Sequence, residues 1–291
     1  MAEYILSNTI LSIKVNSLGA ELCSVKSVTT NIEYIWQADS ALWARHAPHL
    51  FPVVGKLKQG KYVYQNNTYE LPQHGFARDH EFVCIEQTEQ SISFEFTATE
   101  QTLVHFPFHF SLQVTYTLQE DVVTVAYSVY NPDNRDLYFS LGAHPAFNCP
   151  LEVHETFEDY ELQLNGMNVL NVNKLEDGLI LDEHKTLHLS EHLLHLKPSL
   201  FEKDALVLKD TQIHHIKLSS TRSGHGVEME CQGWPYFGIW TKPGTSKFLC
   251  LEPWHGIADS VNATGKLEDK EGIITLKPET YFKSAFTLKF L

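Results

Sequence analysis

The sequence is short of basic residues, and this shortage excludes two classes of partner. Its 291 residues include 22 Lys and Arg against 36 Asp and Glu, giving a formal net charge of −14 at pH 7. Such a surface repels the phosphates of nucleic acids and of anionic lipids. We therefore expect neither a nucleic acid nor a membrane as partner, although a local basic pocket could still receive a small anion.

Long apolar runs and paired cysteines are also missing. No stretch approaches the roughly 18 apolar residues of a membrane-spanning helix, and the opening MAEYILSNTI lacks the basic and apolar regions of a secretory signal. The five cysteines include no CxxC pair, and they are Cys23, Cys84, Cys149, Cys231 and Cys250. This scatter favours buried free thiols in a reducing compartment, so we expect a cytoplasmic protein.

The strongest positive signal is alternation with a period of two. From Phe110 to Leu118 an apolar side chain occupies every second position, and residues 92–96, 123–129 and 282–290 repeat the pattern. Half-buried antiparallel strands produce this spacing, whereas a helix needs apolar residues every three or four positions. Turn residues interrupt the strands at Asn66-Asn67, at 131–134 and at Pro243-Gly244.

Helical signals are few. Ser40 could cap one turn over 41–45, and Ser190 could cap another over 191–195. The polar stretch 165–188 is interpreted as an irregular excursion within the same domain. The chain is thus expected to be all-β, a large antiparallel β-sandwich with only short helical turns, forming one domain over residues 1–291.

Three segments break the alternation and place Gly or Pro beside a titratable side chain: LPQHGFARD (71–79), LGAHPAFN (141–148) and LCLEPWHGIAD (249–259). By itself His144 could be a core histidine, but a glutamate such as Glu252 at the end of an apolar run needs a partner if it is buried. Together an imidazole and a carboxylate give the two groups that proton transfer in both directions requires.

Aromatic residues near these segments fit two roles. They could form core, or they could stack on the apolar face of a sugar ring; the set is Trp234, Phe237, Trp240 and Trp254. The residues alone leave this choice open.

Six segments in this order resemble the aldose 1-epimerase (mutarotase) family, especially its LacX-like branch, which is also similar to the hexose-6-phosphate mutarotases. They are LSIKVNSLGAELCSV, LFPVVGKLKQGKY, ELPQHGFARD, GAHPAFN, FEKDALVLK and LCLEPWHGIADS. The resemblance covers nearly the whole chain and implies a galactose mutarotase-like supersandwich that interconverts the anomers of a sugar.

Site roles follow from the resemblance, residue by residue. It implies that His144 is the general acid for the ring oxygen and Glu252 the general base for the anomeric hydroxyl. His74 would hydrogen-bond the substrate, and Asp204 would hold sugar hydroxyls. Arg78 lies in the HGFAR segment, where an arginine is usual in this branch. At the start of the reaction we expect Glu252 ionised and His144 protonated, each favouring the charge of the other.

Two further residues complete the predicted substrate site. Lys56 stands where the family has an arginine after glycine, and a lysine lacks the bidentate fork of arginine. Trp240 is assigned to the sugar ring. Lys56, Lys58 and Arg78 could together receive a sugar phosphate, or they could be solvated charges at the mouth of the cleft.

Neither a cofactor nor a metal is expected, because the reaction needs only proton transfer and positioning. Histidine pairs with ligand-like spacing occur at 46/49, 105/109, 184/188 and 192/195, but they lie in unlike contexts without cysteines nearby. The expected partner is a small sugar or sugar phosphate, and the expected state is a monomer or homodimer.

Two rival functions stay open. A glycoside hydrolase would use a pair of carboxylates, such as Glu252 with Asp204 or Glu230. A carbohydrate-binding or sensing protein would need no acid–base pair at all.

Overall fold

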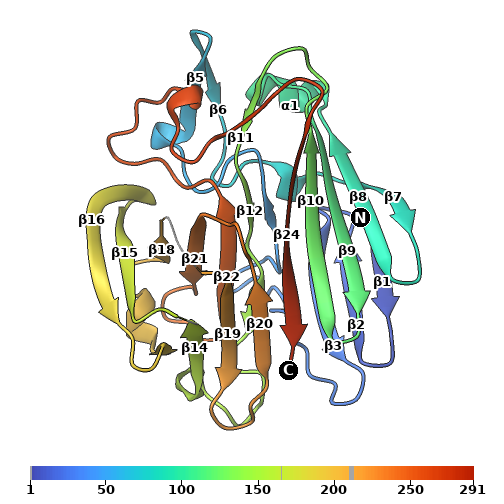
Figure 1. Ribbon diagram of the computed structural model, residues 1–291, viewed down its shortest axis with the longest axis vertical. Coiled ribbons are helices and arrows are strands. Elements are labelled where there is room, and N and C mark those ends of the chain that lie inside the picture. Colours follow the sequence, from blue (N-terminus) through green and yellow to red (C-terminus); the bar gives the residue numbers. More distant parts are fainter. Residues whose placement is uncertain (1, 165, 210–212) are drawn as a thin grey trace.

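The computed structural model describes residues 2–164, 166–209 and 213–291, and antiparallel strands dominate it (Figure 1). The largest sheet has nine strands, in the order β17 (Leu193–His195), β14 (Tyr160–Leu164), β19 (His215–Ser220), β20 (Gly226–Glu230), β24 (Tyr281–Phe290), β10 (Val122–Tyr130), β9 (Ser111–Gln119), β8 (Ser91–Thr97) and β7 (Val83–Gln87). Neighbouring strands in this sheet run antiparallel.

The second large sheet has eight strands. Its order is β16 (Leu179–His188), β15 (Val169–Glu176), β18 (Leu206–Leu208), β21 (Tyr236–Trp240), β22 (Phe248–His255), β12 (Leu141–Ala143) and β4 (His49–Leu50), with β13 (Ala146–Asn148) also paired to β22. Smaller sheets are β1 (Glu3–Ser7), β2 (Leu11–Asn16) and β3 (Glu21–Ser27); β5 (Lys61–Tyr64) and β6 (Asn67–Glu70); and β11 (Leu137–Phe139) and β23 (Ile274–Leu276). The segments around His144 and Glu252 thus meet at β22.

The predicted alternation is confirmed in the strands. In β9 the even-numbered residues from 112 to 118 are buried and the odd-numbered residues from 111 to 117 are partly exposed; β10 alternates in the same way. Val125 of β10 pairs with Tyr116 of β9, so apolar side chains stand beside one another on the same face. The buried cluster that they join runs from Leu6 to Phe290, and the expected all-β sandwich is confirmed.

The helical expectations were wrong in detail. The one α-helix among the described residues is α1 (Glu100–His105), which is capped by Thr99; this helix was not predicted from the sequence. Around Ser40 the chain forms a turn without a helix, and Asp39 accepts from the Ala41 N–H instead. After Ser190 the chain turns into strand β17, because Leu194 pairs with Leu162 and buries its side chain.

Short 3₁₀ turns account for the remaining helical structure. They are η1 (Lys58–Gly60), η2 (Ala77–Asp79), η3 (Phe157–Asp159), η4 (Pro198–Phe201) and η5 (Leu267–Asp269). Within the described residues, no helix has the length and apolar character to cross a membrane.

The region 165–188 is not irregular as expected. Its described residues form the hairpin β15–β16, which extends the eight-stranded sheet at the left of Figure 1. The alternation is hard to see in the sequence for two reasons. The pairing register shifts between Asn173 and Leu175, and most residues of β16 are exposed and polar. The turn at Asp177-Gly178 brings this hairpin close to the site described below.

All five cysteines are free, as predicted. Four of them are buried, and Cys84 is partly exposed. Burial raises the pKa of Cys23 and of Cys231 to about 12, so these thiols stay protonated and behave as small apolar side chains.

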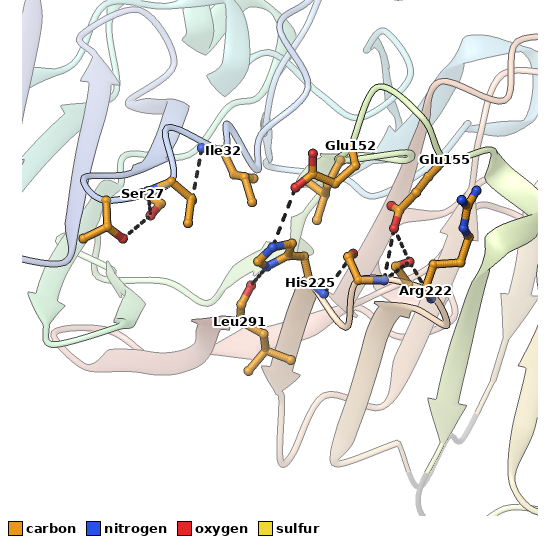
Figure 2. A network of polar contacts seen from close by, with 12 residues as sticks. Ser27, Ile32, Glu152, Glu155, Arg222, His225 and Leu291 are labelled. Carbon is orange, nitrogen blue, oxygen red and sulfur yellow. Dashed lines mark hydrogen bonds and ion pairs between the residues drawn. The ribbon is translucent and has the colours of Figure 1, made fainter.

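A polar network fastens the loop that follows β13 (Figure 2). The buried carboxylate of Glu155 accepts hydrogen bonds from the hydroxyls of Ser220 and Tyr160 and from the Ser223 N–H. His225 in the same turn region lies 3.7 Å from Glu152. The network ties the segment after β13 to the β19–β20 turn, and so steadies the strand that adjoins β22.

A histidine on β4 forms a second buried network. Nδ1 of His49 lies 2.7 Å from the Tyr127 hydroxyl, and Nε2 lies 2.7 Å from the Tyr116 hydroxyl. Because Tyr116 donates to the Ala20 carbonyl, it accepts from Nε2, and Nδ1 accepts from Tyr127. Burial lowers the pKa of His49 to about 4, in keeping with this neutral tautomer. The three side chains connect β4 with β9 and β10.

Tyr127→Phe removes the donor to Nδ1 of His49 and leaves a buried acceptor without a partner. The free energy of unfolding should fall by about 1–3 kcal/mol, measured by urea unfolding at pH 7. Tyr130→Phe, on the same strand but partly exposed, is the matched control and should change stability by less than about 0.5 kcal/mol. Equal losses in the two variants would contradict the network.

Candidate active site

The carboxylate of Glu252 lies on β22, inside the eight-stranded sheet. β22 pairs with β21 on one side and with β12 and β13 on the other. Gly142 and Gly238 face Trp254, where a Cβ would lie 2.8 Å and 2.4 Å from the indole ring. These glycines leave room for the ring, and Glu252 is only 2% exposed beside it.

His144 reaches Glu252 from the link between β12 and β13. Its backbone N–H donates to the Pro48 carbonyl, and the Pro145 carbonyl accepts from the Leu251 N–H. The link is therefore held on both sides of the imidazole, to the residue before β4 and to β22. Nε2 of His144 lies 3.2 Å from Oε2 of Glu252, so the structure brings the predicted acid and base into contact.

Both side chains border a cavity of about 300 Å³. This volume is at the lower end of small-molecule sites and suits a compact ligand such as one sugar ring. Six of the seven predicted site residues border it: His74, Arg78, His144, Asp204, Trp240 and Glu252. Lys56 is not among the described residues that form the wall. Its Nζ donates to the Asp177 carbonyl at 2.9 Å instead.

His74 is held by an unusual backbone and by contacts at both ring nitrogens, with Nε2 lying 3.3 Å from the Gln73 side-chain amide. It has φ +68°, and Gly75 follows with φ +70°. A Cβ at Gly75 would lie 2.2 Å from the Phe51 carbonyl oxygen, so only glycine fits this turn. The Gly55 N–H donates to Nδ1 of His74 at 3.1 Å, which leaves the proton on Nε2. Burial lowers the pKa of His74 well below its usual range, so the ring is a neutral hydrogen-bond donor.

Arg78 provides the positive charge on the wall. Its Nη2 donates to the Gln73 carbonyl at 2.7 Å, and its Nε lies 3.8 Å from Asp79. Nε is buried and has no hydrogen-bond partner among the described residues, as is also true of Nδ1 of His144. Buried polar atoms normally have partners, and a ligand rich in hydroxyl groups would supply them.

The three cations considered for phosphate do not converge. Arg78 borders the cavity, but Lys56 is bound to the Asp177 carbonyl, and Nζ of Lys58 donates to the Ala263 carbonyl at 3.3 Å. Nζ of Lys56 is thus bound at the β15–β16 turn, next to the wall residue Gly178, and Nζ of Lys58 is bound to a loop outside the wall.

Asp204 also lines the cavity, on a strained backbone. Its φ is +148°, a region that side chains rarely occupy. One carboxylate oxygen accepts from the Ala205 N–H at 2.7 Å. Leu175 and Ile180 of the β15–β16 hairpin line the cavity beside it, so the segment expected to be irregular forms part of the site.

Trp43, which was not predicted from the sequence as a site residue, also lines the cavity. Its ring stacks on the His144 imidazole with centroids 5.0 Å apart and an interplanar angle of 26°. A tryptophan in a short turn far upstream carries no local signal of this contact.

Burial works against charge on both members of the pair. It raises the pKa of Glu252 well above its usual range, and Asp204 adds to the effect. It lowers the pKa of His144 to about 3, with Arg78 acting in the same direction. Against our expectation of an ion pair, burial therefore favours a protonated carboxyl facing a neutral imidazole. In either form the pair holds one proton, and its transfer across the contact interconverts the two.

Among the described residues, three side chains of kinds that can bind a metal lie close together. The group is His144, Cys250 and Glu252, whose donor atoms lie within 4.8 Å of one another. Sulfur and imidazole would suit a soft ion such as zinc. An ion held there would engage both groups of the proton-transfer pair, so the two uses of this group exclude each other.

Comparisons with known proteins show which family the chain is similar to. The sequence model of the family described as aldose 1-epimerase matches residues 3–287. The LacX proteins of Lactococcus lactis, plasmid and chromosomal, are 32% identical over 295 residues, which cover 98% of this chain and 98% of theirs.

Solved structures extend the likeness to three dimensions. A galactose mutarotase related enzyme from Lactobacillus acidophilus is 34% identical, with a TM-score of 0.95 over 100% of this chain and 97% of that chain. A galactose mutarotase-like protein from Lactobacillus casei is 29% identical, with a TM-score of 0.92 over 100% of both. The chain therefore belongs to the aldose 1-epimerase family.

Proposed function

We propose that this chain interconverts the α and β anomers of an aldose, with Glu252 and His144 exchanging protons with the sugar. The observation that carries the proposal is the 3.2 Å contact between these side chains at the wall of a cavity of about 300 Å³. An acid and a base that face one small cavity can act on two oxygens of the same ring.

Ring opening needs one proton removed from O1 and one given to O5. When Glu252 takes the O1 proton and His144 donates to O5, the ring C–O bond breaks and an open-chain aldehyde forms. Rotation about C1–C2 then exposes the other face, and reversed transfers close the ring as the second anomer. After opening, both side chains are neutral, which is the form that burial favours. The open-chain stage thus places no charge in the buried site.

The other wall residues suit a sugar. His74 offers an N–H donor, and Arg78 offers a guanidinium with a free donor. Asp204 can accept from hydroxyls, and the Trp240 ring can cover an apolar ring face. Because Arg78 is the one member of the predicted phosphate set on the wall, we infer a free aldose as the first substrate to test.

The rival carboxylate pairs are placed differently. Asp204 shares the cavity wall with Glu252, whereas Glu230 is exposed at the end of β20. A hydrolase would release reducing sugar from a glycoside and lose that activity in Glu252→Gln. A binding protein would hold a sugar without speeding its anomerisation.

His144→Asn and Glu252→Gln should each slow anomer exchange by about 10²–10⁴-fold, since each removes one proton-transfer group. Exchange is measured by NMR on fresh α-glucose, α-galactose and their 6-phosphates. His188→Asn and Glu230→Gln, which change exposed side chains, are matched controls and should retain wild-type rates. Full activity in the first two variants would refute the residue assignment, whereas no acceleration by the wild type would refute the function for these sugars.

The pH profile of kcat/KM should show no acidic limb near pH 6.5, because burial keeps the His144 imidazole neutral there and one proton stays on the pair. The lowered pKa of His144 moves the acidic limb below the usual value of about 6.5, and the raised pKa of Glu252 moves the basic limb above about 4.5. Rates are corrected for the uncatalysed reaction at each pH. An acidic limb centred near pH 6.5 would show that the imidazole is hydrated like a surface histidine.

A further inference from the structure

We propose that Trp43 is a positioning residue that holds the His144 ring in place and keeps water from it, so that His144 exchanges protons only with Glu252 and the sugar. This inference rests on the proposed function and adds a residue to which no role has been assigned. Trp43 itself transfers no proton, because an indole N–H does not titrate in this range.

The aromatic contacts of Trp43 enclose the imidazole. Its ring stacks on His144, at 5.0 Å and 26°, and also on Phe248, at 5.5 Å and 19°. Trp240 meets Trp43 edge-on at 5.6 Å and His144 edge-on at 5.8 Å. The imidazole is thus bounded by one indole stacked on its face and by a second indole at nearly a right angle to it.

Several hydrogen bonds fix the turn that carries Trp43. The Trp43 N–H donates to the Asp39 carbonyl at 2.8 Å, and the Trp43 carbonyl accepts from Nε1 of Trp36 at 2.9 Å. Nζ of Lys242, just after β21, donates to the neighbouring Leu42 carbonyl at 2.7 Å. Contacts from two other parts of the chain therefore hold the ring at a defined position, as preorganised proton transfer requires.

The stacking of Trp43 on His144 explains why little water reaches the imidazole. Trp43 is partly exposed, while the His144 side chain beneath it is only 9% exposed. A stacked indole occupies the space from which water would approach the ring face. Burial is the largest cause of the lowered pKa of His144, and Trp43 provides part of that burial.

Other groups face His144 from several elements and bear on its titration. They are Glu252 and Cys250 on β22, His74 in the segment after β6, Arg78 in η2 and Arg45 beside Trp43. None of them is changed by a substitution at Trp43, so a shift in the His144 titration reports on the indole.

The test is an NMR titration of the histidine rings without sugar, with the His144 signals identified by their loss in His144→Asn. In the wild type His144 should stay neutral down to about pH 5, and in Trp43→Ala its midpoint should move up toward about 6.5 as water enters. Trp43→Phe keeps an aromatic face and should stay near the wild type. With an active sugar, Trp43→Ala should lower kcat about tenfold or more and change KM by less than about threefold.

Two further variants make the result decisive. Lys242→Met leaves the indole in place but releases its turn, and should shift the His144 midpoint upward by less than Trp43→Ala does; it decides the question if Trp43→Ala does not fold. Tyr281→Ala, an exposed aromatic truncation on β24, should leave the midpoint unchanged. An unshifted His144 midpoint in folded Trp43→Ala, or in Lys242→Met where that variant decides, overturns the proposal. Failure of the wild type to exchange anomers would instead overturn the proposed function, since the titration needs no sugar.

Discussion

The contact between His144 and Glu252 is the interaction on which the site depends, and the sheet around β22 makes it possible. Two ionisable groups can be buried together at modest cost only if they share a proton or neutralise each other. β12 and β13 both pair with β22, and the link between them carries the imidazole to the carboxylate. The eight-stranded sheet is therefore both scaffold and wall of the site.

The same burial determines the chemistry. In water a carboxylate and an imidazole carry opposite charges between about pH 4.5 and 6.5, but here burial raises the pKa of Glu252 and lowers that of His144. The pair then holds one mobile proton with little net cost in charge, which suits a reaction that only moves protons. The neutral His74 and the strained Asp204 surround this pair with hydrogen-bonding groups of fixed direction.

Several segments of the chain that are distant in sequence build the wall. The turn before β4 supplies Trp43, the segment before η2 supplies His74, and the β15–β16 hairpin supplies Leu175 and Ile180. A glycine lets two of these segments pack closely. A Cβ at Gly55 would lie 2.5 Å from the side chain of Ala258, and both residues line the cavity. Family membership accounts for the common architecture, and the details of this wall decide which sugar fits.

The sequence by itself determined the all-β class, since period-two alternation in 110–118 and 123–129 has one geometric explanation, and it determined the free thiols and the segments around His144 and Glu252. It did not predict β15–β16, because a register shift and exposed polar residues obscure the alternation there. It also could not predict that Lys56 binds a backbone carbonyl, that Trp43 covers His144, or that burial would favour the neutral forms of Glu252 and His144. Those outcomes depend on neighbours supplied by distant strands, and therefore only the tertiary structure decided them.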